Sequence, residues 1–239
     1  MIKVKSFYLT DTGRVREHNE DSVTILKNIS GEYLCVVADG MGGHRKGEVA
    51  SALTVAHLGK RFTESASIGT KIDAVNWLSD NINEINKEIL NYGEENENSK
   101  GLGTTVVAAI VTKEFLIFAN IGDSSGYVIK NNKLHKVTKP HTLVNLLVDA
   151  GDLTPEQAAN HPKKNVLMKA LGASEKCEPD IFDVDNESSA VFLCSDGLTG
   201  MLSDEQIEKV LLDSDLTVEE KVVKLIKKCN ARGGNDNIS

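Results

Sequence analysis

The stretch TTVVAAIVTKEFLIFANIGD, residues Thr104 to Asp123, contains two short apolar runs. The runs 104–112 and 115–121 are rich in valine and isoleucine and short enough to be buried strands rather than helices. Only Lys113 and Glu114 separate them, whereas a parallel pair would need a crossover of a dozen or more residues. The sequence therefore predicts an antiparallel hairpin within a sheet that is at least partly antiparallel.

Further strands and helices follow from the same patterns. Apolar runs at 33–38, 126–130 and 190–194 predict three more strands. Apolar residues recur at alternating steps of three and four at Val75, Leu78, Ile82, Ile85 and Ile89. This spacing predicts a helix with one buried face. Two more helices are expected, one over 47–62 and one that carries Val218, Val222, Leu225 and Cys229.

Helix starts and one loop can also be predicted. Ser203 with Gln206 fits a capping box, and so does Thr154 with Gln157, where Pro155 takes the first helical position. The segment 91–100, NYGEENENSK, is polar and charged, and we expect it to be an exposed loop.

Composition limits the class of protein. The chain has 239 residues, 40% of them hydrophobic and 26% charged, which favours one globular domain over residues 1–239. Its net charge of -8 would repel the phosphates of nucleic acid and anionic membranes, so neither is an expected partner. Four cysteines without C-x-x-C spacing predict neither a zinc site nor a redox pair. No leader or long apolar segment is recognisable, so we expect a soluble, cytoplasmic protein.

Three apolar runs are each followed by an aspartate, namely Asp39, Asp123 and Asp196, and Asp236 lies in the glycine-rich turn GGNDN. Any one of these could be an ordinary turn residue, because Asp-Gly is a common turn signal. Carboxylates that meet at one edge of a sheet would repel each other by several kcal/mol unless cations lay between them. The repetition therefore indicates a metal site, and its oxygen ligands favour Mg²⁺ or Mn²⁺ over zinc.

Seven segments in order along the chain resemble the bacterial branch of the metal-dependent protein phosphatases, the PPM or type 2C family. They are TDTGRVREHNEDS (10–22), VADGMGGHRKGEVAS (37–51), GLGTT (101–105), NIGDSS (120–125), HPKKNVLMKALG (161–172), CSDGLTGMLSDEQI (194–207) and GGNDNIS (233–239). The resemblance covers nearly the whole chain. It implies an α+β fold, a four-layer α-β-β-α sandwich of two mainly antiparallel sheets flanked by helices.

The resemblance also implies roles for individual residues. Asp39 would bridge two metal ions, the carbonyl of Gly40 would bind one of them, and Asp196 and Asp236 would complete the other. Asp123 matches a third, weaker metal site, Asp21 would reach the ions mainly through water, and Arg16 would bind substrate phosphate. Animal relatives carry a histidine where this chain has Met41, and His44 is the candidate here for protonating the leaving group, although metal-bound water could do so instead.

The implied activity is hydrolysis of phosphoserine and phosphothreonine in proteins by a water that two Mn²⁺ or Mg²⁺ ions activate. Phosphorylated proteins and an opposing eukaryotic-like serine/threonine kinase are the implied partners, and we expect a monomer. A pseudophosphatase that binds without catalysis is the alternative, but such proteins usually lack the metal-binding aspartates. A two-metal nuclease fits the acids and not the negative charge.

Three positions depart from the family pattern. Residues 141–172 match a flap beside the active site. Pro140 and Ser125 stand where relatives usually have aspartate and arginine. Flap geometry and substrate choice could therefore differ from those of the relatives. Relatives continue past Ser239 into an apolar strand that is missing from this sequence. We expect that the sequence is trimmed; if the strand were truly absent, Asp236 would lie almost at a chain end, where fraying would weaken metal binding.

Overall fold

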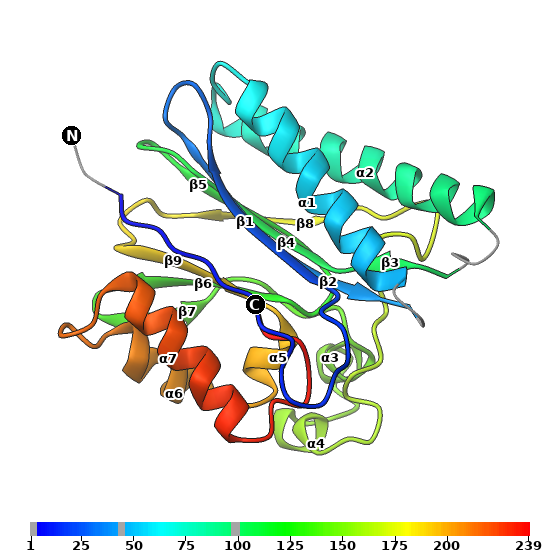
Figure 1. Cartoon of the computed structure of the whole chain (residues 1–239), viewed down its shortest axis with the longest axis vertical. Coiled ribbons are helices and arrows are strands. Elements are labelled where there is room, and N and C mark those ends of the chain that lie inside the picture. Colours follow the sequence, from blue (N-terminus) through cyan, green and yellow to red (C-terminus); the bar gives the residue numbers. More distant parts are fainter. Residues whose placement is uncertain (1–3, 43–45, 97–100) are drawn as a thin grey trace.

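Two antiparallel sheets stack face to face in the computed structural model, which describes residues 4–42, 46–96 and 101–239 (Figure 1). The first sheet has the order β1-β2-β4-β5-β8, with β3 paired on β2. Its strands are β1 (Asp21–Lys27), β2 (Tyr33–Met41), β3 (Gly103–Thr104), β4 (Val106–Val111), β5 (Leu116–Ile121) and β8 (Asp180–Val184). The second sheet has the order β7-β6-β9, with β6 (Ser125–Lys130), β7 (Lys133–Lys136) and β9 (Ala190–Cys194).

Helices cover both outer faces of this sandwich (Figure 1). The long helices α1 (Lys46–Glu64) and α2 (Lys71–Glu95) lie on the first sheet, and α6 (Asp204–Leu211) and α7 (Val218–Ala231) lie on the second. Three short helices are α3 (Leu143–Asp149), α4 (Pro155–Ala159) and α5 (Asp196–Thr199). The predicted α-β-β-α sandwich is therefore confirmed.

Three apolar clusters lie between these four layers. One joins α1 and α2 to the first sheet, and it buries the predicted stripe of α2, in which Leu78, Ile82, Ile85 and Ile89 are fully buried. A second, around Phe118 and Val128, fills the space between the sheets, and a third joins β6 and β9 to α5, α6 and α7. Burial of these side chains, at roughly 1.5 to 3 kcal/mol each, is the main force holding the layers together.

The hairpin prediction is confirmed, because β4 and β5 pair antiparallel from Val111 opposite Leu116 to Val106 opposite Ile121. The first run is divided, however. Gly103 and Thr104 pair with the end of β2, whereas β4 begins at Val106. Both predicted capping contacts are also present, since side-chain oxygens of Gln157 and Gln206 accept hydrogen bonds from the backbone N–H groups of Thr154 and Ser203.

The predicted loop over 91–100 is wrong in its first half. α2 continues to Glu95, and Tyr92 packs against the apolar cluster beneath that helix. Tertiary packing therefore extends the helix into a polar sequence that helix propensity alone would not predict to be helical. Residues 97–100 lie outside the described part of the chain.

The last residues of the sequence are held firmly. Asp11 and Ile238 exchange two backbone hydrogen bonds of 2.9 Å each, and Ser239 contacts Ser195 through both its N–H and its carbonyl. These contacts lie two and three residues after Asp236 in the chain. Within the described residues, no helix combines the length and the apolar character that a membrane crossing would need.

Candidate active site

Asp39 and Asp21 lie directly opposite each other on β2 and β1. The backbone N–H of Asp39 donates to Oγ1 of Thr105 at 3.1 Å, and its carbonyl accepts from the N–H of Thr105 at 2.8 Å. Oγ1 of Thr104 donates to the same carbonyl at 2.8 Å. The GTT segment thus fixes the backbone of Asp39, which lies inside β2 rather than after its end.

Asp123 and Asp196 come from turns at the ends of other strands. Asp123 lies between β5 and β6, and its neighbour Ser124 shares a 2.8 Å hydrogen bond with the hydroxyl of Thr105. Asp196 begins α5 directly after β9, and its carboxyl is within hydrogen-bonding reach of Asp39. Strands of both sheets therefore contribute acids to one site at the end of the sandwich.

Asp236 and Arg16 complete this group. Nη2 of Arg16 donates to Oδ2 of Asp236 at 2.9 Å. Their side chains are 53% and 36% exposed, so this ion pair lies at the surface of the site. A residue predicted to bind phosphate is thus bonded to a residue predicted to bind metal.

The carboxyl groups raise one another's pKa values. Burial, and then the charges of Asp21, Asp196, Asp123 and Asp236, hold the pKa of Asp39 well above its usual range. The structure therefore brings all five predicted aspartates together.

The same causes act on two of the neighbours. Burial raises the pKa of Asp123 to about 7, with Asp196 adding to the effect. Burial likewise raises the pKa of Asp21 to about 6, although a hydrogen bond from Ser195 opposes the shift. A buried carboxylate cluster of this kind is a recognised feature of functional sites.

The cluster fits divalent cations. Oδ1 of Asp21 is buried without a hydrogen-bond partner, which leaves an acceptor for an ion or its water. Among the described residues, burial and then the charge of Asp236 raise the pKa of Asp196, although Arg16 opposes this shift, and Lys136 likewise opposes the raised pKa of Asp123. In the part of the chain that is described, no three histidine, cysteine or acidic side chains stand ready to hold one ion. Side chains would have to move, and Asp236 would have to leave its ion pair with Arg16.

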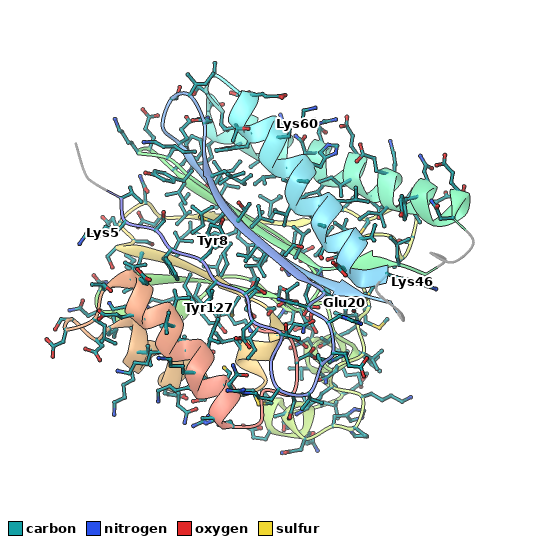
Figure 2. The ribbon with its side chains drawn as sticks, in the orientation of Figure 1. Lys5, Tyr8, Glu20, Lys46, Lys60 and Tyr127 are labelled. Carbon is teal, nitrogen blue, oxygen red and sulfur yellow. The ribbon has the colours of Figure 1, made fainter. Side chains whose placement is uncertain are left out.

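Gly40 lies where the backbone is crowded. A Cβ atom there would come within 2.2 Å of the carbonyl oxygen of Gly47 and 2.5 Å of that of Glu20. Its N–H donates to the same Glu20 carbonyl at 3.1 Å. Glu20 stands at the site end of the sandwich, immediately before β1 (Figure 2). Only glycine fits this close approach.

Sequence reasoning missed three residues that build the site. Thr105 ties β2 to the Asp123 turn, Ser195 donates to Oδ2 of Asp21 at 2.8 Å, and Asn237 contacts the loop before β1. All three are buried polar residues beside a predicted ligand. Ser195 and Asn237 stand next to an aspartate in the sequence, which was the available signal for these two, but it could not show which distant groups they reach.

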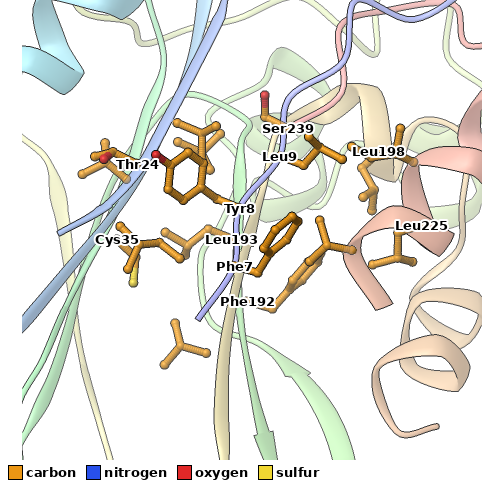
Figure 3. Close-up of a pocket in the computed structure, with 17 residues that line it drawn as sticks. Phe7, Tyr8, Leu9, Thr24, Cys35, Phe192, Leu193, Leu198, Leu225 and Ser239 are labelled. Carbon is orange, nitrogen blue, oxygen red and sulfur yellow. The ribbon is translucent and has the colours of Figure 1, made fainter. Parts of the chain in front are cut away.

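His44 falls within 43–45, outside the described residues. A pocket between the N-terminal segment, β9 and α7 is lined mainly by apolar side chains such as Phe7, Phe192 and Leu225 (Figure 3). Such a lining does not suit a phosphoryl group.

Known proteins resemble this chain over most of its length. The sequence pattern of protein phosphatase 2C matches residues 12–237. The serine/threonine phosphatase Stp of Listeria monocytogenes is 42% identical, over 97% of this chain and 92% of its own. The crystal structure of Stp1 from Staphylococcus aureus superposes with a TM-score of 0.89 at 38% identity, covering 96% and 90% of the two chains. A PstP catalytic domain in complex with two manganese ions has a TM-score of 0.82 at 34% identity, with 96% and 93% covered.

Proposed function

The chain belongs to the protein phosphatase 2C family, and we propose that it hydrolyses phosphoserine and phosphothreonine in proteins with the help of divalent cations held by its aspartate cluster. It is an enzyme, a metal-dependent serine/threonine protein phosphatase. The observation that carries this proposal is the meeting of Asp21, Asp39, Asp123, Asp196 and Asp236 at one end of the sandwich.

The residues of the chain would divide the work of binding. Asp39, with the carbonyl of Gly40, and then Asp196 and Asp236 would hold two ions, which is the number of manganese ions in the PstP complex. Asp123 would hold a third, and Asp21 would contact the ions through water. Two adjacent Mn²⁺ or Mg²⁺ ions supply a water of lowered pKa, so that hydroxide is available near neutral pH.

Arg16 would bind and orient the substrate phosphate. Its planar guanidinium offers paired donors that match phosphate oxygens and would stabilise negative charge during phosphoryl transfer. It now pairs with Asp236 on a half-exposed surface. An exposed ion pair is worth only about 0 to 1 kcal/mol, so a phosphate dianion or a cation at Asp236 can displace it.

The family resemblance of the sequence also suggests what surrounds the site. We propose that residues 141–172, which contain α3 and α4, act as a flap within a single domain. A bridge between Thr142 and Leu167 closes the base of this segment. His44 stays a candidate for protonating the leaving oxygen. We further propose a cytoplasmic monomer that opposes a serine/threonine kinase.

A peptide assay tests the proposal. Wild-type protein should release phosphate from a phosphothreonine peptide with Mn²⁺ and not with excess EDTA. Asp39→Asn and Asp196→Asn should abolish this release, because each removes a carboxylate from the cluster. Asp183→Asn is the matched control, since Asp183 pairs with Lys71 on the far surface of β8. Equal activity in all three variants would refute the site.

A further inference from the structure

We propose that Asn237 is a positioning residue, whose side chain fixes the loop that bears Arg16 against the turn that bears Asp236. The inference rests on the proposed function, because it concerns how Arg16 is placed to meet a phosphate. Asn237 is only 6% exposed and joins segments that lie more than 200 residues apart in the chain.

Three hydrogen bonds run from this one side chain to the loop. Nδ2 of Asn237 donates to the carbonyls of Thr12, at 3.0 Å, and His18, at 2.9 Å. Oδ1 accepts from the backbone N–H of Glu20 at 2.9 Å. The contacts fall on both sides of Arg16, so the amide clamps the loop at its beginning and its end.

The backbone of Asn237 reaches the other two parts of the site. Its N–H donates to Oδ1 of Asp236 at 2.9 Å. A Cβ atom on Gly197 would lie 1.9 Å from its carbonyl oxygen, so Asn237 packs directly against the residue that follows Asp196. One residue therefore sets the relative positions of Arg16, Asp236 and the Asp196 turn.

Arg16 needs such support because its own contacts are weak. Its side chain is 53% exposed and pairs with the partly exposed carboxylate of Asp236. Once that pair opens, the guanidinium is placed by the backbone of the loop. A shift of about 1 Å in a group that positions substrate can cost up to roughly a hundredfold in rate. The clamp should thus act on phosphate binding rather than on overall folding.

The variant Asn237→Ala removes the clamp, and Asn28→Ala is its matched control. Asn28 is also 6% exposed and makes three hydrogen bonds, to Glu32 twice and to Ser65. It lies just past the opposite end of β1 from Asp21. Both changes delete an equally buried amide, so a shared loss of stability is expected from each.

Kinetics with p-nitrophenyl phosphate and Mn²⁺ distinguish the effect of Asn237→Ala on phosphate binding from the loss of stability that it shares with Asn28→Ala. We expect Asn237→Ala to raise KM, and the Ki of inorganic phosphate, by about tenfold or more, and Asn28→Ala to leave both unchanged. In an Arg16→Ala background, the further effect of Asn237→Ala should nearly vanish, because the loop then has no guanidinium to position. Additive losses in this cycle would make Asn237 merely structural and would overturn the inference.

Trypsin supplies a readout that needs no metal. Cleavage after Arg14 and Arg16 should accelerate more in Asn237→Ala than in Asn28→Ala, while cleavage elsewhere changes to the same extent in both variants; equal acceleration after Arg14 and Arg16 in the two variants would contradict a local clamp. If Asn237→Ala does not fold, Asn237→Asp keeps the shape and the acceptor for Glu20 but loses both donors, and its KM must still rise. A wild-type enzyme without Mn²⁺-dependent hydrolysis would refute the proposed function, whereas an active wild type with unchanged KM in these variants would refute the clamp alone.

Discussion

The guanidinium of Arg16 donates to the carboxylate of Asp236 across 2.9 Å, which joins the side chain expected to bind phosphate to one expected to bind metal. Both are partly exposed, so the pair is readily opened. A cation at Asp236 would compete with Arg16 for the carboxylate, and a phosphate would compete with Asp236 for the guanidinium. A bound cation would therefore release Arg16 for phosphate, and a bound phosphate would release Asp236 for a cation.

Replacing Arg16 by lysine tests its role in binding phosphate. Lysine keeps the charge but loses the planar fork, so kcat/KM on aryl phosphate should fall at least about tenfold, or about 1.4 kcal/mol of transition-state binding. Steady-state kinetics measure this. Arg61→Lys is the control, because Arg61 pairs with Glu84 and Asn81 on the outer helices. Unchanged kinetics in Arg16→Lys would remove Arg16 from the site.

Gly197 should tolerate no side chain. An alanine Cβ there would stand 1.9 Å from the backbone oxygen of Asn237, and backbone cannot move aside as a flexible side chain can. We expect Gly197→Ala to lower the free energy of unfolding by more than about 2 kcal/mol in urea titrations. Gly59→Ala is the comparison, since its Cβ would meet only a methyl of Leu26 and it gains helix propensity. Equal stability of the two variants would show that the Gly197 contact relaxes freely.

Much of the fold could be predicted from the sequence because its signals are local. The α2 stripe and the β4–β5 hairpin are each decided within a few turns or residues. By contrast β1, β7 and β8 were missed. The β1 sequence DSVTILK mixes polar and apolar residues, and β8 is the short DIFDV. Their strand character comes from pairing with β2 and β5, which no local pattern reveals.

The residues of the site likewise divide into those that the sequence predicts and those that it does not. Four of the aspartates were recognisable because each follows an apolar run or lies in a glycine-rich turn, and the resemblance added Asp21 and supplied the expected roles. The bond from Ser195 to Asp21 and the contacts of Asn237 could not be predicted, because they join segments more than 170 residues apart. Nor did the sequence show that Asp236 and Arg16 would be bonded to each other.

The Asp39 carboxyl should destabilise the metal-free protein and stabilise the loaded one. Its burial among four other aspartates opposes its ionisation, so Asp39→Asn in EDTA should have a higher Tm than wild type. Wild type should gain about 2.7 kcal/mol at Mn²⁺ concentrations near 100 times Kd, and the variant should gain far less. Differential scanning calorimetry with and without Mn²⁺ measures both. An identical Mn²⁺ gain in Asp39→Asn would exclude Asp39 as a ligand.

Stability of the metal-free protein should also depend on pH through Asp123. Its pKa rises from 3.8 to about 7 on folding, chiefly by burial. Between about pH 4 and pH 7 the folded state keeps a proton that the unfolded state has lost, so stability falls as pH rises and is lowest above pH 7. Urea titrations in EDTA should show a smaller fall for Asp123→Asn than for wild type.

Asp213→Asn is the control for that series. Asp213 is a surface residue whose pKa is lowered, mainly by the hydrogen bond that it accepts from Lys224. Its contribution to the pH dependence of stability therefore has the opposite sign to that of Asp123. This variant should retain the wild-type fall between pH 4 and pH 7. A fall in Asp123→Asn as large as in wild type would mean that Asp123 does not titrate in this range.

The most direct test of the aspartate cluster is a crystal structure grown with Mn²⁺ and measured at the manganese absorption edge. We expect anomalous peaks within about 2.0 to 2.3 Å of carboxylate oxygens of Asp39, Asp196 and Asp236, with Asp236 turned away from Arg16. A map without peaks at these oxygens, with Arg16 still bonded to Asp236, would contradict the account.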